Sequence, residues 1–495
     1  MTKQITKHFM AFFLSLLMAV SMGLTAFAEG TTYKLTLTGT TEGHTYEAYQ
    51  IFTGDLSTNT DGKKVLSNVA WGTGVTYTGT ESAADVAKAL ADGKTMTIAQ
   101  LEEKLTLTTP AKTVASAKDS TVTVIDGLAA GYYLVKDQDG SQVGGSDAYT
   151  KFIVQVVGDT EIKIKSDVPT VVKKVKDTND STGTKSEWQD SADYDIGDVV
   201  PYQITGTMPE NIADYTLYKY VFTDTMSVGL TYTANNVKIT IGGIGGKDVT
   251  SSFKETVTPN TDGTTTVKWS CDNLKGIEGV TLNPDTKVVV NYTAKLNENA
   301  VVGADGNPNE VDLTYSNNPN KGGDGETGKT PKDKNIVFTY KTVVNKVDQD
   351  GKTPLPGAAF KLEKKSDGTY TTVKEFTAGT DTKFEFNGLD DGDYKLSETT
   401  TPAGYNTIAP IEFTISAEHD TDSDDPKLTS LTGKVTSGEA TFTVEKDARS
   451  LTTNVKNMKG STLPSTGGIG TTIFYAAGGA LVVLAGVMIA ARKRA

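Results

Sequence analysis

Few residues of this chain are of types that could carry out enzymatic chemistry. Outside the N-terminal segment the only histidines are His44 and His419, and Cys271 is the only cysteine of the chain. The sequence contains no nucleophile elbow, phosphate-binding loop or zinc-protease helix motif. A single cysteine also excludes an internal disulfide. The sequence therefore predicts a protein that is not an enzyme and that needs no cofactor.

One stretch has the spacing of a calcium-binding loop. Asp420, Asp422 and Asp424 alternate as the first ligands of such a loop would. The sixth position, however, is Asp425 instead of glycine, and the twelfth is Leu431 instead of glutamate. We therefore expect a solvated acidic loop there and no metal site.

The C-terminus combines three features in a specific order. A pentapeptide is followed by an uncharged segment, whose most apolar part is 473–491, and then by the basic triplet 492–494. As a helix, 473–491 is just long enough to cross a bilayer of roughly 30 Å, with the basic triplet in the cytoplasm. The pentapeptide consists of Leu463, Pro464, Ser465, Thr466 and Gly467. Its order with the apolar segment and the basic triplet resembles the sorting signal of sortase substrates.

The resemblance to a sorting signal implies a specific reaction. The membrane span would hold the pentapeptide at the membrane face, where a membrane-bound transpeptidase works. In sortase substrates the enzyme's cysteine attacks the threonine carbonyl, which here belongs to Thr466, and releases Gly467 with its tail. Thr466 thereby becomes the acyl donor.

The N-terminus has the features of a secretory signal peptide. Lys3 and Lys7 precede the apolar run 9–24, and the small-x-small site 26–28 follows at once. The chain of 495 residues has a formal net charge of −13, which argues against binding to nucleic acid or to an anionic membrane. We expect a secreted protein, which without disulfides must obtain its durability in another way.

Strand patterns dominate the region between the two terminal signals. Tyr33, Leu35 and Leu37 alternate with polar residues, which is the period of a half-buried strand. Similar runs are found at 121–125, 152–157, 237–241, 287–292 and 336–340. Helical periodicity is limited to 82–91 and 98–105. The fold class is therefore all-β, with sandwich domains as the natural architecture.

Two places look like joints between domains or long loops. At 165–169 an expected strand ends and a proline follows, which indicates a domain boundary. The stretch 316–335 is rich in Asn, Gly, Lys and Asp. We interpret 316–335 as a long surface loop of the second domain, closed by a strand at 336–341. The resulting segments are a signal peptide (1–28), three domains (29–167, 168–341 and 342–460) and the sorting signal (461–495).

A second motif lies in the third of these domains. Residues 394–405 read YKLSETTTPAGY and resemble the E-box of major pilins, the backbone subunits of sortase-assembled pili on Gram-positive bacteria. A shorter internal similarity relates the sequence of 127–137 to that of 388–398. The resemblance implies Ig-like sandwich domains of the Cna-A and Cna-B type, with minor helices in the first domain. It also implies a subunit that is polymerised covalently and anchored to the cell wall.

The resemblance further implies the partners. These are pilus-class and housekeeping sortases, identical subunits in a head-to-tail polymer, peptidoglycan, and minor pilins and host surface ligands; nucleic acid is not among them.

Major pilins stiffen their domains with Lys–Asn isopeptide bonds that form beside a carboxyl group, and the resemblance implies two such triads here. The triads are Lys173, Asp224 and Asn309 in the second domain, and Lys346, Glu398 and Asn457 in the third. Alternation places all three residues of the first triad in apolar rows, so they should point inward. Lys346 is less clear, because its row contains both Val344 and Asp348.

Burial explains why these residue types would react. A low dielectric lowers the pKa of a lysine and raises that of a carboxyl group. A neutral amine can then attack the Asn amide, while the protonated acid polarises its carbonyl and ammonia leaves. The alternative is a buried salt bridge capped by asparagine.

The first domain departs from the pattern. Asp137 occupies the place that Glu398 has in the third domain, and Lys34 could supply the amine. No asparagine occurs from 137 to 167, where the last strands should lie. We therefore expect no cross-link in this domain.

The lysine that accepts Thr466 of the next subunit is implied to lie just before the second domain. The usual Tyr-Pro-Lys-Asn context is absent, which leaves Lys163 and Lys165 as candidates. Lys165 borders the domain joint, whereas Lys163 lies deeper in the expected strand, so we favour Lys165.

Two other functions compete with this interpretation. A monomeric wall-anchored adhesin would have the same sorting signal but no acceptor lysine. A wall-anchored hydrolase would need paired acids or a nucleophile in a cleft, and no such motif is found.

Overall fold

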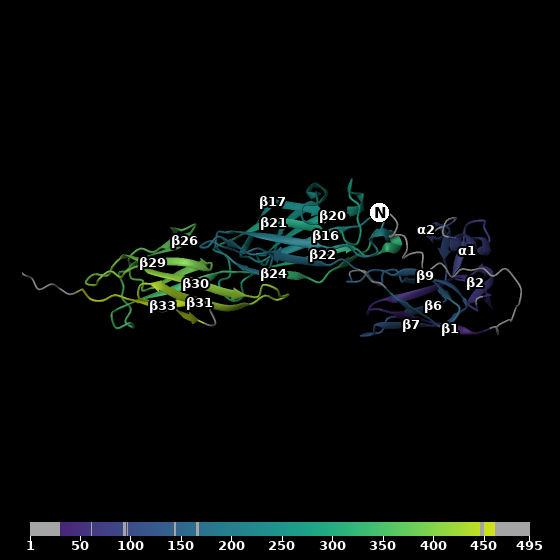
Figure 1. Ribbon diagram of the computed structural model, residues 1–495, viewed down its shortest axis with the longest axis horizontal. Coiled ribbons are helices and arrows are strands. Elements are labelled where there is room, and N and C mark those ends of the chain that lie inside the picture. Colours follow the sequence, from purple (N-terminus) through teal and green to yellow (C-terminus); the bar gives the residue numbers. More distant parts are fainter. Residues whose placement is uncertain are drawn as a thin grey trace, which may run out of the picture.

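The computed structural model describes residues 30–460 except 61, 93–95, 97, 143–144, 165–167 and 446–449. Three β-rich bodies lie end to end along its long axis, the first in purple, the second in teal and the third in green to yellow (Figure 1). The expected signal peptide, Lys165 and the sorting signal lie outside the described residues. Within the described part, no helix is both long and apolar enough to span a membrane.

The first body has two separate cores. Tyr46 and Ala48 of β2 pack against Leu35 of β1 on one side, whereas Phe52 packs with Val86 of α1 on the other. Its strands are β1 (Thr32–Thr38), β7 (Val122–Ala129) and β10 (Thr160–Lys163) in one sheet; β2 (Thr45–Thr58), β3 (Lys64–Trp71), β6 (Lys112–Ala115), β8 (Gly131–Asp137) and β9 (Lys151–Val156) in a second; and β4 (Val75–Tyr77) with β5 (Leu105–Leu107).

The helices of the first body nearly match the expectation. The helix α1 spans Ala83–Asp92 and begins after Ser82, whose Oγ accepts a hydrogen bond from the Asp85 backbone at 3.2 Å. The helix α2 spans Ile98–Glu102 and is shorter than expected, because Leu105 belongs to β5 and pairs with β4.

The second body is a sandwich of two large sheets. One sheet has the order β11 (Val171–Val175), β15 (Val199–Gly206), β21 (Val288–Leu296), β17 (Leu230–Ile241) and β18 (Lys247–Asp248). The other has the order β14 (Ser191–Asp193), β24 (Asp333–Phe338), β22 (Asn307–Ser316), β16 (Tyr220–Met226), β20 (Thr265–Cys271) and β19 (Lys254–Pro259), with β23 (Thr327–Lys329) beside β22. A small ribbon pairs β12 (Thr178–Asn179) with β13 (Thr184–Lys185), and the 3-10 turns are η1 (Ile212–Asp214), η2 (Thr250–Ser252), η3 (Leu274–Gly276) and η4 (Pro319–Lys321).

The third body is a smaller sandwich. One sheet has the order β28 (Lys383–Leu389), β25 (Tyr340–Val347), β33 (Ser450–Lys456) and β32 (Thr443–Glu445). The other has the order β27 (Thr369–Glu375), β26 (Ala359–Ser366), β29 (Gly392–Thr400), β30 (Ile411–His419) and β31 (Leu428–Ser437). Its first and last long strands, β25 and β33, are parallel neighbours.

The strand expected at 336–341 serves two bodies. Val337 packs into the core of the second body, whereas Ile336 and Phe338 pack into that of the third. The chain leaves β24 at Phe338 and starts β25 at Tyr340. Because one strand contributes to both cores, the second and third bodies share a continuous apolar joint.

The segment 316–335 does not behave as a free surface loop. Asn317 and Asn318 are fully buried, and the Asn317 amide donates to the carbonyl oxygen of Gln142 in the first body at 2.9 Å. The Tyr315 hydroxyl donates to the carbonyl oxygen of Ser146 at 2.6 Å. The segment is therefore a docking surface for the first body, which its polar composition did not indicate.

Candidate cross-link sites

Three residues expected from the sequence meet in the middle of the second body. Lys173 lies on β11, Asp224 on β16 and Asn309 on β22, and all three side chains are 0% exposed. The Lys173 ammonium contacts Asp224 Oδ2 directly. Because β11 belongs to one sheet and the other two strands to the opposite sheet, the residues face each other across the sandwich.

A fourth residue, Tyr292 on β21, links the three. Its hydroxyl accepts hydrogen bonds from Lys173 Nζ at 2.5 Å and from Asn309 Nδ2 at 2.9 Å. The same hydroxyl donates toward Asp224, with both carboxylate oxygens at 3.1 Å. The sequence argument missed Tyr292, although the alternation in 287–292 places it on the same face as Val288 and Val290.

Aromatic rings enclose this site. The Lys173 ammonium lies 5.1 Å from the ring centroids of both Tyr202 and Tyr292, which stack on each other. Trp269 packs against Tyr292 with a centroid distance of 5.1 Å. The rings exclude water and leave the amine in a medium of low dielectric.

Burial shifts the pKa values of both charged partners in the directions that favour their neutral forms. Burial lowers the pKa of Lys173, although the neighbouring Asp224 carboxylate opposes this shift. Burial raises the pKa of Asp224, against the attraction of Lys173. Transfer of the proton from Lys173 to Asp224 would give the neutral amine and protonated acid that attack on an amide requires.

A second asparagine lies next to the proposed acceptor. Asn335 on β24 is the antiparallel ladder partner of Asn309 on β22, so both side chains share one face. Asn335 is also 0% exposed, and neither of its amide atoms has a hydrogen-bond partner among the described residues. Asn335 is therefore a natural control for the identity of the acceptor.

In the third body the expected acid and amide meet directly, whereas the lysine bonds a neighbouring backbone carbonyl. Lys346 on β25 is 0% exposed, and its Nζ donates to the carbonyl oxygen of Val455 at 2.9 Å. Glu398 on β29 accepts a hydrogen bond from Asn457 Nδ2, with both carboxylate oxygens at 3.0 Å. Burial lowers the pKa of Lys346 to about 8, although Glu398 and Asp348 attract its proton.

The two asparagines have the same unsatisfied atom. Asn309 Oδ1 and Asn457 Oδ1 are both buried without a hydrogen-bond partner. Turning each amide by about 180° exchanges its oxygen and nitrogen. The carbonyl oxygen would then face Asp224 or Glu398, whose protonated form could donate a hydrogen bond to it.

In the first body the corresponding acid has a different partner. Asp137 is 0% exposed, and its Oδ1 lies 2.8 Å from Nδ1 of His44. Asp147 faces the other ring nitrogen at 3.6 Å. The side chain of Lys34 is 56% exposed and lies beside Asp126, so the structure does not bring it to Asp137.

The His44 pair should make the first body sensitive to alkaline pH. Burial alone would lower the pKa of His44, but Asp137 and Asp147 outweigh it and raise this pKa to about 9. Since the unfolded value is near 6.5, the contribution is fully present below pH 6.5 and is lost as the pH rises through about 9. We expect a loss on the order of 3 kcal/mol for this domain, measured by calorimetry between pH 7 and 10. His44→Gln should flatten the dependence; an unchanged profile in this variant would contradict the assignment to His44.

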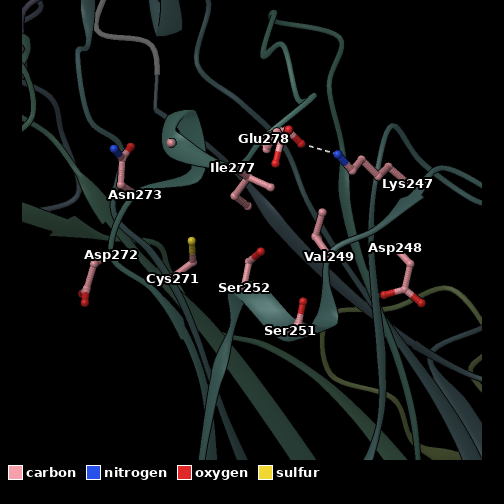
Figure 2. A pocket seen from close by; sticks show the side chains of 11 residues that line it. Lys247, Asp248, Val249, Ser251, Ser252, Cys271, Asp272, Asn273, Ile277 and Glu278 are labelled. Carbon is pink, nitrogen blue, oxygen red and sulfur yellow. Dashed lines mark hydrogen bonds between the residues drawn. The ribbon is translucent and has the colours of Figure 1, made fainter.

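A shallow hollow on the second body contains the only cysteine (Figure 2). Cys271 lies at its wall, and Lys247 donates a hydrogen bond to the carbonyl oxygen of Glu278 across it. None of the described residues that line the hollow is a histidine. Burial raises the pKa of the Cys271 thiol, which keeps the thiol protonated and a poor nucleophile.

Comparisons with known families agree with this geometry. A model for a Cna-B-like domain of Gram-positive pilin backbone subunits matches 196–319, and a prealbumin-like fold domain matches 341–427. The LPXTG cell wall anchor motif matches 456–495, which includes the sorting signal expected from the sequence.

Known relatives cover nearly the whole chain. The trypsin-resistant surface T6 protein of Streptococcus pyogenes serotype M6 is 25% identical over 97% of this chain and 99% of its own length. The solved structure of the T6 backbone pilin of the same serotype covers 88% of this chain and 100% of its own, at 19% identity and a TM-score of 0.53. The two structures share a fold of modular β-rich domains.

The anchor motif, the pilin domain model and the full-length relative all point to one family. They also agree with the secretion signals and the all-β architecture. This chain belongs to the sortase-assembled major pilins of Gram-positive bacteria, the backbone subunits of surface pili anchored to the cell wall.

Proposed function

We propose that this subunit carries tension along the pilus through two internal isopeptide bonds. In each bond the lysine Nζ attacks Cγ of the asparagine, ammonia leaves, and a secondary amide remains. The pairs are Lys173 with Asn309 beside Asp224, and Lys346 with Asn457 beside Glu398. The observation that carries the proposal is the fully buried meeting of Lys173, Asp224 and Asn309 from opposite sheets.

The positions of the bonded residues define a short path for force. A bond from β11 to β22 would bypass 174–308, and a bond from β25 to the end of β33 would bypass 347–456. Load would then pass mainly through 310–345, which contains the shared strand β24. The domain limits 168–341 and 342–460 are retained as part of this proposal.

Polymerisation would join Thr466 of one subunit to Lys165 of the next. A pilus-class sortase would make this bond, and a housekeeping sortase would transfer the finished polymer to peptidoglycan. Minor pilins and host surface ligands are further partners in this scheme. The subunit itself would act as a structural protein and not as an enzyme.

The acceptor lysine can be identified by substitution. We expect Lys165→Arg to abolish the ladder of boil-resistant, high-mass bands on a blot of cell wall, while the monomer is still secreted and wall-attached. Lys163→Arg is the matched control, because Lys163 is the last residue of β10 and its side chain is exposed. The exposed side chain of Lys163 is thus accessible, although we expected its place in the strand to limit access by an enzyme.

Each outcome of this experiment has a clear meaning. A ladder that persists in Lys165→Arg but is lost in Lys163→Arg would identify Lys163 as the acceptor. A wild-type protein that forms no ladder would instead support the monomeric wall-anchored adhesin.

A further inference from the structure

Carboxylates from distant parts of the sequence gather at the joint between the second and third bodies. Asp193 ends β14, and Asp390 and Asp391 form the turn between β28 and β29. Carboxylate oxygens of these three residues lie within 4.8 Å of one another, as do ligand atoms of Asp177, Asp193 and His419. Asp193 and Asp390 are only 2% and 0% exposed, so their repulsion is poorly screened.

A lysine beside the cluster is already paired with carboxylates. Lys364 on β26 lies 2.5 Å from Asp195, 3.1 Å from Asp390 and 3.2 Å from Asp180. It therefore offsets part of the negative charge at Asp390 and leaves Asp193 without a lysine partner among the described ion pairs.

The nearby His419 is oriented by a hydrogen bond from its Nδ1. Ser191 donates its hydroxyl proton to the carbonyl oxygen of Asp420 at 2.5 Å, so its oxygen accepts from His419 Nδ1 at 2.7 Å. His419 Nε2 lies 3.6 Å from Asp193 Oδ1, which is beyond hydrogen-bond distance but close enough for an ion pair when the ring is protonated.

Two oxygens at the joint make no hydrogen bond of good geometry within the described part of the chain. One is Asp193 Oδ2, and the other is the hydroxyl of Tyr340, which is 0% exposed. The Tyr340 hydroxyl lies close to Asp193, because burial, the charge of this carboxylate and a direct contact with it together raise the pKa of Tyr340. Unpaired buried oxygens are costly, and these two lie beside an excess of negative charge.

We propose that this joint binds one calcium ion, held by the carboxylates of Asp193, Asp390 and Asp391. Ca²⁺ prefers oxygen ligands at about 2.3–2.6 Å, so ligands up to roughly 4.8 Å apart can share one ion. Bound there, the ion would neutralise Asp193 and tie the turn before β29 to β14. It would thus stiffen the joint between the two bodies without a covalent bond, and it does not depend on the isopeptide bonds.

Calorimetry on the fragment 29–460, which contains all three bodies, tests the site directly. After treatment with EDTA, titration with CaCl₂ should show one site with a dissociation constant of about 10⁻⁴–10⁻³ M, as in other extracellular modules. At 10 mM Ca²⁺ the equilibrium constant for folding of the two bodies at the joint should rise about 10- to 100-fold. This rise would be observed as a higher melting temperature. No heat of binding and no thermal shift at 10 mM would overturn the proposal.

Variants distinguish calcium binding from a structural role of the aspartates. Asp193→Asn should abolish the Ca²⁺-dependent shift, yet in EDTA it should melt no lower than the wild type, because repulsion is relieved. Asp391→Asn, at the half-buried edge of the cluster, should weaken binding as well and serves if Asp193→Asn fails to fold. Asp424→Asn, an exposed acid on the neighbouring loop, is the matched control and should behave as the wild type. Unchanged Ca²⁺ binding in both cluster variants, or a site that takes Zn²⁺ but not Ca²⁺, would contradict the assignment.

Discussion

The fragment 29–460 should have an intact mass about 34 Da below that of its sequence, because each of two bonds releases one ammonia of about 17 Da. We expect the reaction to need no enzyme or cofactor, because the amine, the acid and the amide of each triad are buried within one domain. The deficit should therefore be complete in protein purified from a host without sortases. Electrospray mass spectrometry of the intact protein measures it.

Substitution of the acids should restore the missing mass one bond at a time. Asp224→Ala and Glu398→Ala should each recover about 17 Da, beyond the mass change of the substitution, because no protonated acid remains to polarise the amide. A mass equal to the plain sequence in the wild type would reject the cross-links altogether.

The acceptor in the second domain is tested by two neighbouring amides. Asn309→Ala should also recover about 17 Da, again after the change in side-chain mass is subtracted. Asn335→Ala, its ladder partner on the same face, should keep the full deficit. The reverse result would assign the bond to Asn335.

Alternation along strands predicted much of the first triad. Val171, Lys173 and Val175 occupy one row of β11, and all three are buried, as the two-residue period indicated. Lys346 was harder to predict, because Asp348 appeared to share its row. The strand β25 ends at Val347, so Asp348 lies beyond the strand and says nothing about the direction of Lys346.

Contacts between elements that are distant in sequence could not be predicted. Tyr292 joins the first triad only because β21 and β16 lie in facing sheets, and no local pattern reports which strands face each other. The same holds for Asp193 and Asp390, which meet at a joint between two bodies. The polar composition of 316–335 was likewise misleading, since Asn317 and Asn318 are buried instead of solvated, and Asn317 bonds to the first body.

Loss of the cross-link should strongly destabilise the second domain. A bond from Lys173 to Asn309 closes most of this domain into one loop, which by analogy with a disulfide contributes roughly 4–5 kcal/mol through the unfolded state. Lys173→Ala should therefore lower the melting temperature of the domain by roughly 10–20 °C. It should also expose internal lysines to trypsin, which limited proteolysis followed by electrophoresis would detect.

Lys173→Ala alone does not isolate the bond, because it also leaves the buried Asp224 without its cation. Asn309→Ala provides the second route, since it removes the acceptor while the contact between Lys173 and Asp224 stays in place. Asn335→Ala is the control for a truncated buried amide, because it creates a similar cavity and keeps the bond.

If the cross-link is the source of stability, Lys173→Ala and Asn309→Ala should both become sensitive to trypsin, whereas Asn335→Ala should remain resistant. Equal sensitivity of all three variants would mean that packing around the site, and not the covalent bond, protects the domain.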